Sequence, residues 1–168
     1  MTGNGFELYL VRHGLAGEPG EDWPDDTLRP LTADGVRRFK DEVRGLERLD
    51  VELDVIFTSP LKRARETADL LSRGLAAEPA VKVMQALAPG ASPGAVFAAL
   101  RAVSRHRIAL VGHEPDLGKL AAFLIGAPRP LVFKKGGMCR IDVPSRAMRP
   151  RGTLVWLATP KMLRTAAK

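Results

Sequence analysis

Apolar residues in this chain occur in short continuous runs that alternate with longer segments in which they recur every three or four positions. Short runs bounded by Gly, Pro or acidic residues predict buried strands, whereas the wider spacing predicts amphipathic helices. We predict strands at 6–12, at 53–59, at 81–84 and at 108–111, with a closing strand pair in the segments MCRIDVP and TLVWLATP.

The helices are predicted from their end signals as well as from their periodicity. Thr32 is a suitable N-cap for a helix with apolar residues at steps of three and four. A second helix is expected to begin with Pro60 in its first turn and to end near Gly74. Further helices are predicted over 93–103 and from Pro115 onward.

Strands that alternate with helices at these spacings predict right-handed crossover connections and an α/β fold. We expect a three-layer sandwich, with a largely parallel central sheet flanked by helices on both faces. In such sheets ligands bind beyond the carboxyl ends of the strands. This rule places three polar segments on one rim of the sheet: Arg12 and His13, residues 59–63, and Gly112 with His113.

The size and composition predict a single domain over residues 1–168, with 45% hydrophobic and 27% charged residues. The N-terminal segment MTGNGFELYL lacks the basic and long apolar regions of a secretory signal. The lone Cys139 cannot form an internal disulfide. These features are typical of a cytoplasmic protein, and no membrane association is expected.

The net charge of +7 is unevenly distributed. Residues 129–168 hold ten Lys or Arg against one acid, Asp142, whereas residues 1–128 hold sixteen against eighteen acids. A basic segment can attract nucleic acid, anionic partners or phosphorylated substrates, or can be a solvated surface. No aromatic residues are interleaved for base stacking, so we favour the solvated surface over nucleic-acid binding. We expect a monomer.

Three motifs follow one another in order: RHG closing the first predicted strand, SPLKRARETA opening a helix, and VGHEP closing a later strand. Together they resemble the signatures of the histidine phosphatase superfamily. The short chain and the segments RPLTADG and GHEPDLG resemble the small SixA-like phosphohistidine phosphatase branch. The resemblance covers nearly the whole chain and implies a phosphoglycerate mutase-like fold. It also implies a phosphatase that forms a covalent phosphohistidine intermediate on His13.

The chemistry of these residue types leads to the same hypothesis. Phosphoryl transfer needs an in-line nucleophile and cations around the equatorial oxygens. The neutral imidazole of His13 can attack phosphorus, and nearby arginines should keep its pKa low. The cations are expected from Arg12, Arg63 and a His113 that is or becomes protonated beside a dianionic phosphate. Two further phosphate contacts are predicted, from the backbone amide of Gly14 and from Arg29 at the pocket edge.

Other readings of the histidines are weaker. His13 alone could be a turn or core histidine, but the second strand-end histidine, His113, favours a catalytic role. His106 lies at a predicted helix C-terminus, where a cation favours the helix dipole, so no function is assigned to it. The three histidines lack zinc-site spacing, and no nucleotide P-loop motif occurs. No metal or organic cofactor is expected.

The general acid is where the chain departs from many superfamily members, which carry a carboxylate between the second and third motifs. Residues 81–101 contain no acid. An alkoxide leaving group needs a proton donor, whereas the imidazole of phosphohistidine is a better leaving group. A protein phosphohistidine is therefore the favoured substrate. The alternatives are a small-molecule phosphomonoesterase with an acid from the early loop (Glu18, Asp22, Asp25 or Asp26) and a non-catalytic phosphate-binding module.

Overall fold

The computed structural model describes residues 5–147 and 151–168. Within these ranges a six-stranded sheet has the order β3-β2-β4-β1-β5-β6. The strands are β1 (Phe6–Arg12), β2 (Val55–Thr58), β3 (Ala80–Val83), β4 (Arg107–Gly112), β5 (Met138–Val143) and β6 (Thr153–Ala158). Strands β1 to β4 run parallel to one another, whereas β5 is antiparallel to both of its neighbours, β1 and β6. The predicted α/β fold with a largely parallel sheet is confirmed.

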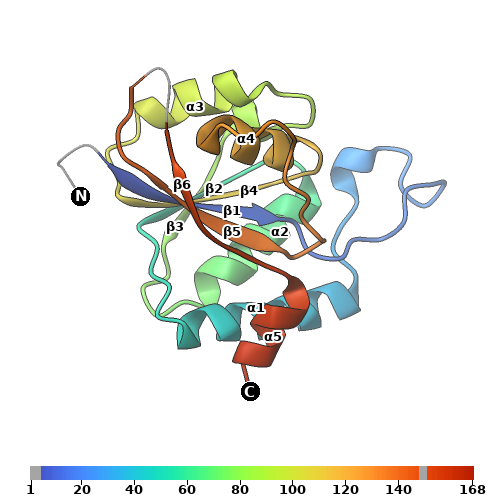
Figure 1. Cartoon of the computed structure of the whole chain (residues 1–168). Helices are drawn as coiled ribbons and strands as arrows, with labels where there is room; N and C mark the ends of the chain where they lie inside the picture. The colour runs from blue at the N-terminus through green and yellow to red at the C-terminus, as the bar shows by residue number, and fades with distance from the viewer. Residues whose placement is uncertain (1–4, 148–150) are drawn as a thin grey trace.

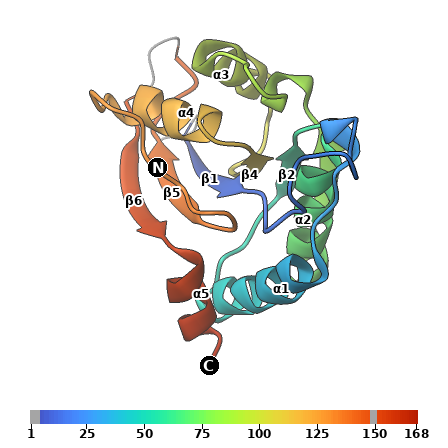
Figure 2. The same ribbon diagram turned by 90° about the vertical axis from the view of Figure 1, so that its right-hand side faces the viewer.

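The α-helices form the two outer layers (Figures 1 and 2). They are α1 (Ala33–Arg48), α2 (Lys62–Arg73), α3 (Pro93–Arg101), α4 (Asp116–Ile125) and α5 (Pro160–Ala166), with short 3₁₀ turns at Asp26–Leu28 and Gln85–Leu87. Helices α3 and α4 cover one face of the sheet, and α1, α2 and α5 cover the other (Figure 1). None of the helices in the described ranges is long and apolar enough to cross a membrane.

Each face of the sheet has its own apolar core because successive strand residues point to opposite faces. Leu8 and Leu10 of β1 pack toward α3 and α4, whereas Tyr9 and Val11 pack toward α1 and α2. The continuous apolar runs of β1 and β4 are thus explained, since both are central strands that are buried on both sides.

The helix starts agree with their sequence signals, with one shift and one omission. The Thr32 hydroxyl caps α1 by accepting from the amide of Gly35. Pro60 lies just before α2 rather than in its first turn, because Leu61 is the N-cap residue. Helix α5 was not predicted: its seven residues are too few to show a clear period, although Thr159 caps it and Pro160 opens it.

Helix α5 packs directly on α1 at Gly45. A Cβ atom at Gly45 would lie only 2.1 Å from the backbone oxygen of Leu163, so the close approach of the two helices requires glycine at this position. This contact places α5 directly beside α1 on the same face of the sheet (Figure 2).

Candidate active site

The two strand-end histidines lie side by side because β1 and β4 are neighbouring strands in register. Arg12 pairs with Gly112 in the ladder, so His13 and His113 each follow a paired strand end. The ring centroids of the two histidines are 5.1 Å apart, close to the spacing of about 4.8 Å between adjacent strands. Strand β2 ends at the same rim, where the Ser59 amide donates to the Val111 carbonyl.

The proton position on His13 follows from a single hydrogen bond. Its Nδ1 lies 2.8 Å from the carbonyl oxygen of Gly14. A carbonyl oxygen only accepts, so the neutral ring carries its proton on Nδ1 and a lone pair on Nε2. The nitrogen that can attack phosphorus is therefore Nε2.

Both histidines are neutral at pH 7 in this arrangement. Burial lowers the pKa of His13 to about 3 against the opposing effect of the Gly14 carbonyl, and the electrostatic influence of His113, Arg63 and Arg12 lowers it to a smaller extent. Burial also lowers the pKa of His113 to about 4, mainly assisted by Arg63 and opposed by Asp116 and Asp26. The protonation of His113 beside a bound dianionic phosphate stays a prediction.

Three buried nitrogens in this region have no hydrogen-bond partner among the described residues: Arg12 Nε, Arg63 Nε and His113 Nδ1. Buried polar atoms nearly always have a partner, which for such groups is often a ligand or water. All three belong to residues predicted to hold the phosphoryl group. Their unused capacity is suited to the oxygens of a tetrahedral anion.

Arg12 is held by a two-step connection from the third motif. Its Nη1 donates to the Phe133 carbonyl at 2.6 Å, and the Phe133 amide donates to Glu114 Oε1 at 2.7 Å. Glu114 therefore positions Arg12 from beside His113. Sequence reasoning assigned Glu114 no role, because its partner is separated from it by 19 residues.

Ser59 is a second residue without an assigned role in the sequence. Its Oγ lies 2.8 Å from His113 Nε2 and accepts from the Leu61 amide. The hydroxyl proton is then free to bond to Nε2, which leaves the proton of the neutral imidazole on Nδ1, the nitrogen with no partner. The position of Ser59 at the end of β2, on the predicted rim, was the available signal.

Gly14 does not have the predicted geometry. Its amide donates to the Thr67 hydroxyl at 3.0 Å, and that hydroxyl donates to the Arg63 carbonyl. The amide is thus used to fix the loop against α2, so the structure does not provide it as a phosphate donor. A Cβ at Gly14 would make only ordinary contacts, the shortest at 3.4 Å to Leu31.

The early loop reaches Arg63 through Asp26. Two guanidinium nitrogens of Arg63 donate to the Asp26 carbonyl and carboxylate, each at 2.9 Å. The same carboxylate accepts from Arg29 Nε at 2.7 Å, and Arg29 Nη1 donates to the Gly17 carbonyl. Arg29 therefore stabilises this loop, while its predicted phosphate contact stays a prediction.

The four early-loop acids considered as proton donors are poorly suited to that role in this conformation. The hydrogen bond from Arg29 lowers the pKa of Asp26, and bonds from Thr27 lower the pKa of Asp25, so both are ionised at neutral pH. Glu18 and Asp22 are exposed. A fifth carboxylate, Asp116 in the first turn of α4, lies near His113 and accepts from the Gly90 amide at 2.7 Å.

No group of three or more potential metal ligands lies close together in the described ranges.

Residues 8–88 match the histidine phosphatase superfamily (branch 1). An uncharacterized protein of Picosynechococcus sp. is 40% identical over 169 residues, which covers 94% of this chain and 99% of that protein. The chain belongs to the histidine phosphatase superfamily. The resemblance inferred from the three motifs is confirmed.

This histidine phosphatase superfamily hydrolase is also similar to named proteins. Phosphohistidine phosphatase SixA of Escherichia coli is 26% identical over 164 residues, covering 96% of this chain and 98% of SixA. The structure of SixA complexed with tungstate has a TM-score of 0.83 at 24% identity, covering 93% of this chain and 98% of that one. A mycobacterial glucosyl-3-phosphoglycerate phosphatase shares the fold, with a TM-score of 0.68 at 19% identity, 93% coverage of this chain and 100% of that one.

The low pKa values of the two buried histidines predict an acid-sensitive fold. Each imidazole has a lower pKa folded than the usual value of about 6.5, so the unfolded chain binds protons first as the pH falls. The contribution of the two neutral imidazoles to the free energy of unfolding is fully present above about pH 6.5 and is lost toward pH 4. The loss amounts to up to about 1.4 kcal/mol per pH unit for each imidazole. Urea unfolding at pH 7 and pH 5 measures the difference.

The double variant His13→Gln, His113→Gln should lose most of this difference. His106→Gln is the matched control, because His106 is exposed and lies outside the site. Equal pH dependence in the native protein and the double variant would contradict the assignment of two neutral buried imidazoles.

Proposed function

We propose that the protein is a metal-independent phosphatase that removes the phosphoryl group from protein phosphohistidine through a covalent intermediate on His13. The geometry around His13 and His113 supports phosphoryl transfer in general. The observation that carries the choice of substrate is the missing carboxylate in residues 81–101. The 26% identity to phosphohistidine phosphatase SixA supports the same choice.

The first half of the proposed reaction requires no proton movement at His13. The Nε2 lone pair attacks phosphorus as the phosphorus–nitrogen bond of the substrate breaks, while the proton stays on Nδ1, which donates it in a hydrogen bond to the Gly14 carbonyl. A substrate histidine protonated at its distal ring nitrogen then leaves as neutral imidazole. Water next attacks the phosphorus, the bond to His13 breaks, and inorganic phosphate takes up both water protons.

The cations have distinct roles in this proposal. Arg12 and Arg63 stabilise the equatorial oxygens from fixed positions, since each guanidinium is anchored by a backbone carbonyl. His113 donates from Nδ1 as the phosphoryl group transfers. Asp26 competes with the phosphoryl group for Arg63, so binding would require the Asp26 loop to share or release this cation.

A phosphomonoesterase is the second candidate, and Asp116 is the observation that favours it. This carboxylate reaches the 84–92 loop from α4, close to His113. An ester substrate would need such a group to be protonated and to reach the leaving oxygen.

We expect the kcat/KM for a phosphohistidine-bearing protein to exceed that for simple phosphate esters by at least about tenfold, because only the ester needs proton delivery. Side-by-side hydrolysis assays with released phosphate as the readout test this. Asp116→Asn is the informative variant: it should lower ester hydrolysis by a larger factor than phosphohistidine hydrolysis, because only the ester needs a proton from this carboxylate. Faster turnover of esters by the native protein would favour the second candidate, and no turnover of any phosphorylated substrate would favour a binding module.

A further inference from the structure

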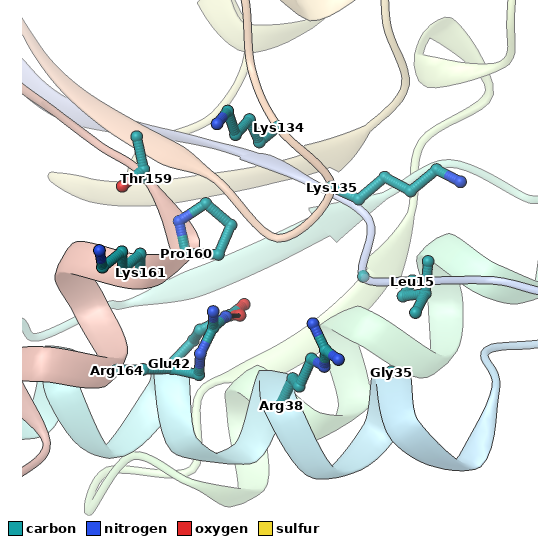
Figure 3. A pocket seen from close by; sticks show the side chains of 11 residues that line it. Leu15, Gly35, Arg38, Glu42, Lys134, Lys135, Thr159, Pro160, Lys161 and Arg164 are labelled. Carbon is teal, nitrogen blue, oxygen red and sulfur yellow. Dashed lines mark hydrogen bonds and ion pairs between the residues drawn. The ribbon is translucent and has the colours of Figure 1, made fainter.

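A basic pocket lies beside the nucleophile, between α1, the start of α5 and the loop before β5 (Figure 3). Its volume is about 330 Å³. Five cationic side chains contribute to its lining: Arg38, Lys134, Lys135, Lys161 and Arg164. These side chains come from three separate segments of the sequence, namely α1, the loop before β5 and the start of α5. The pocket therefore exists only in the folded chain.

The pocket is directly connected to the catalytic segment through the backbone. Gly14 and Leu15, which follow His13, form part of its lining. The loop at residues 134–137, which carries Lys134 and Lys135 and is called the lysine loop, is bonded to the same segment. The Gly136 amide donates to the His13 carbonyl at 3.0 Å, and the Arg12 amide donates to the Gly137 carbonyl at 3.0 Å. The pocket therefore begins at the residue that follows the nucleophile in the chain.

The lysine loop is also fixed against the floor of the pocket. Gly136 has φ +83°, and a Cβ atom there would lie 2.3 Å from Glu42 Oε2. Glycine is thus required for both the backbone conformation and the close approach of the Glu42 carboxyl group. The two lysines before it are held in place by this packing.

Most of the positive charge in the pocket is not neutralised by the protein. Glu42 is buried and paired with Arg164 at 2.5 Å, and Arg38 is paired with Asp34. Burial raises the pKa of Glu42 to about 7, so it carries only part of a negative charge at neutral pH. The ammonium groups of the three lysines have no ion pair with any residue that the structure describes.

We propose that this pocket binds acidic side chains next to the phosphohistidine of a phosphoprotein substrate. The inference rests on the proposed function and adds a selectivity for acidic sequence around the target histidine. Arg38 projects from α1 toward the loop that carries Lys134 and Lys135 (Figure 3), so carboxylates entering the pocket would meet cations from both sides. The excess of basic residues in the C-terminal part of the chain thereby gains a specific role.

Two synthetic phosphohistidine peptides test the proposal, one with glutamate and one with glutamine at the three positions on either side of the histidine. For the native protein we expect kcat/KM to be roughly three- to tenfold higher for the glutamate peptide at low salt. The difference should lie in KM and should shrink at about 0.5 M salt, where surface charges are screened.

The double variant Lys134→Gln, Lys161→Gln should lose this preference, with a ratio near one. Both side chains are exposed, so the fold is not at risk. Arg101→Gln is the matched control on the opposite layer and should keep the native ratio.

Equal kcat/KM for the two peptides with the native protein would overturn the proposal while leaving the proposed function intact. A preference that survives in the lysine double variant would also overturn it. Hydrolysis of neither peptide would instead contradict the proposed function, and with it the substrate that this pocket is inferred to select.

Discussion

His13→Ala should reduce turnover of phosphohistidine substrates by roughly 10⁴-fold or more, because the variant has no nucleophile for the covalent step. It should also abolish the acid-labile phosphoenzyme. Rapid quenching with a labelled phosphohistidine donor, followed by mapping of the labelled residue, measures this directly. In the native protein the label should be on His13.

The fold should tolerate this change, because His13 lies just after β1 rather than within it and the substitution removes a buried group whose charged form is disfavoured. His106→Ala controls for the general loss of a histidine, and it should retain native turnover. Label on a serine, an aspartate or Cys139 would contradict the mechanism. Cys139 is an unsuitable nucleophile, because burial raises the pKa of its thiol to about 12.

His113→Gln should lower kcat by about a hundredfold to a thousandfold, the cost typical of removing one preorganised donor to a developing oxyanion. His113 is the neighbour of the nucleophile, and its Nδ1 has no partner among the described residues. Unlike His13→Ala, this variant should still form the labelled phosphoenzyme, only more slowly. Single-turnover labelling separates the two variants.

Ser59→Ala provides a graded comparison for the same side chain. It removes the hydroxyl that orients His113 through Nε2 but leaves the imidazole in place. Its effect should therefore be smaller than that of His113→Gln. A His113→Gln protein with native kcat would show that the imidazole does not contact the transferring phosphoryl group.

The two expected losses differ in kind because the two imidazoles occupy different electrostatic positions. The Nδ1–H of His13 donates a hydrogen bond to the Gly14 carbonyl and leaves Nε2 free, so the ring is a neutral nucleophile at any pH near neutrality. The Nε2 of His113 is hydrogen-bonded to the Ser59 hydroxyl. The nearby carboxylates of Asp116 and Asp26 interact electrostatically with the His113 ring and favour its protonated form. A bound dianion would add to that preference.

Much of the fold could be predicted from the sequence because the signals are local. Continuous apolar runs marked the buried strands β1 and β4, and Thr32 marked the start of α1. The strand-end motifs also predicted that His13 and His113 lie together, since chain direction in a parallel sheet brings carboxyl ends to one rim, and their ring centroids are 5.1 Å apart. The family resemblance drawn from those motifs is confirmed by the match over residues 8–88.

Only the tertiary structure decided how the candidate site is supported and charged. Glu114 reaches Arg12 through Phe133, Ser59 orients His113, Thr67 engages the Gly14 amide, and Asp26 links Arg29 to Arg63. These partners depend on strand order and on loop packing, which leave no periodic signal in the chain. The basic pocket has the same origin: α5 brings Lys161 and Arg164 to the lysine loop only because Gly45 lets it pack closely on α1.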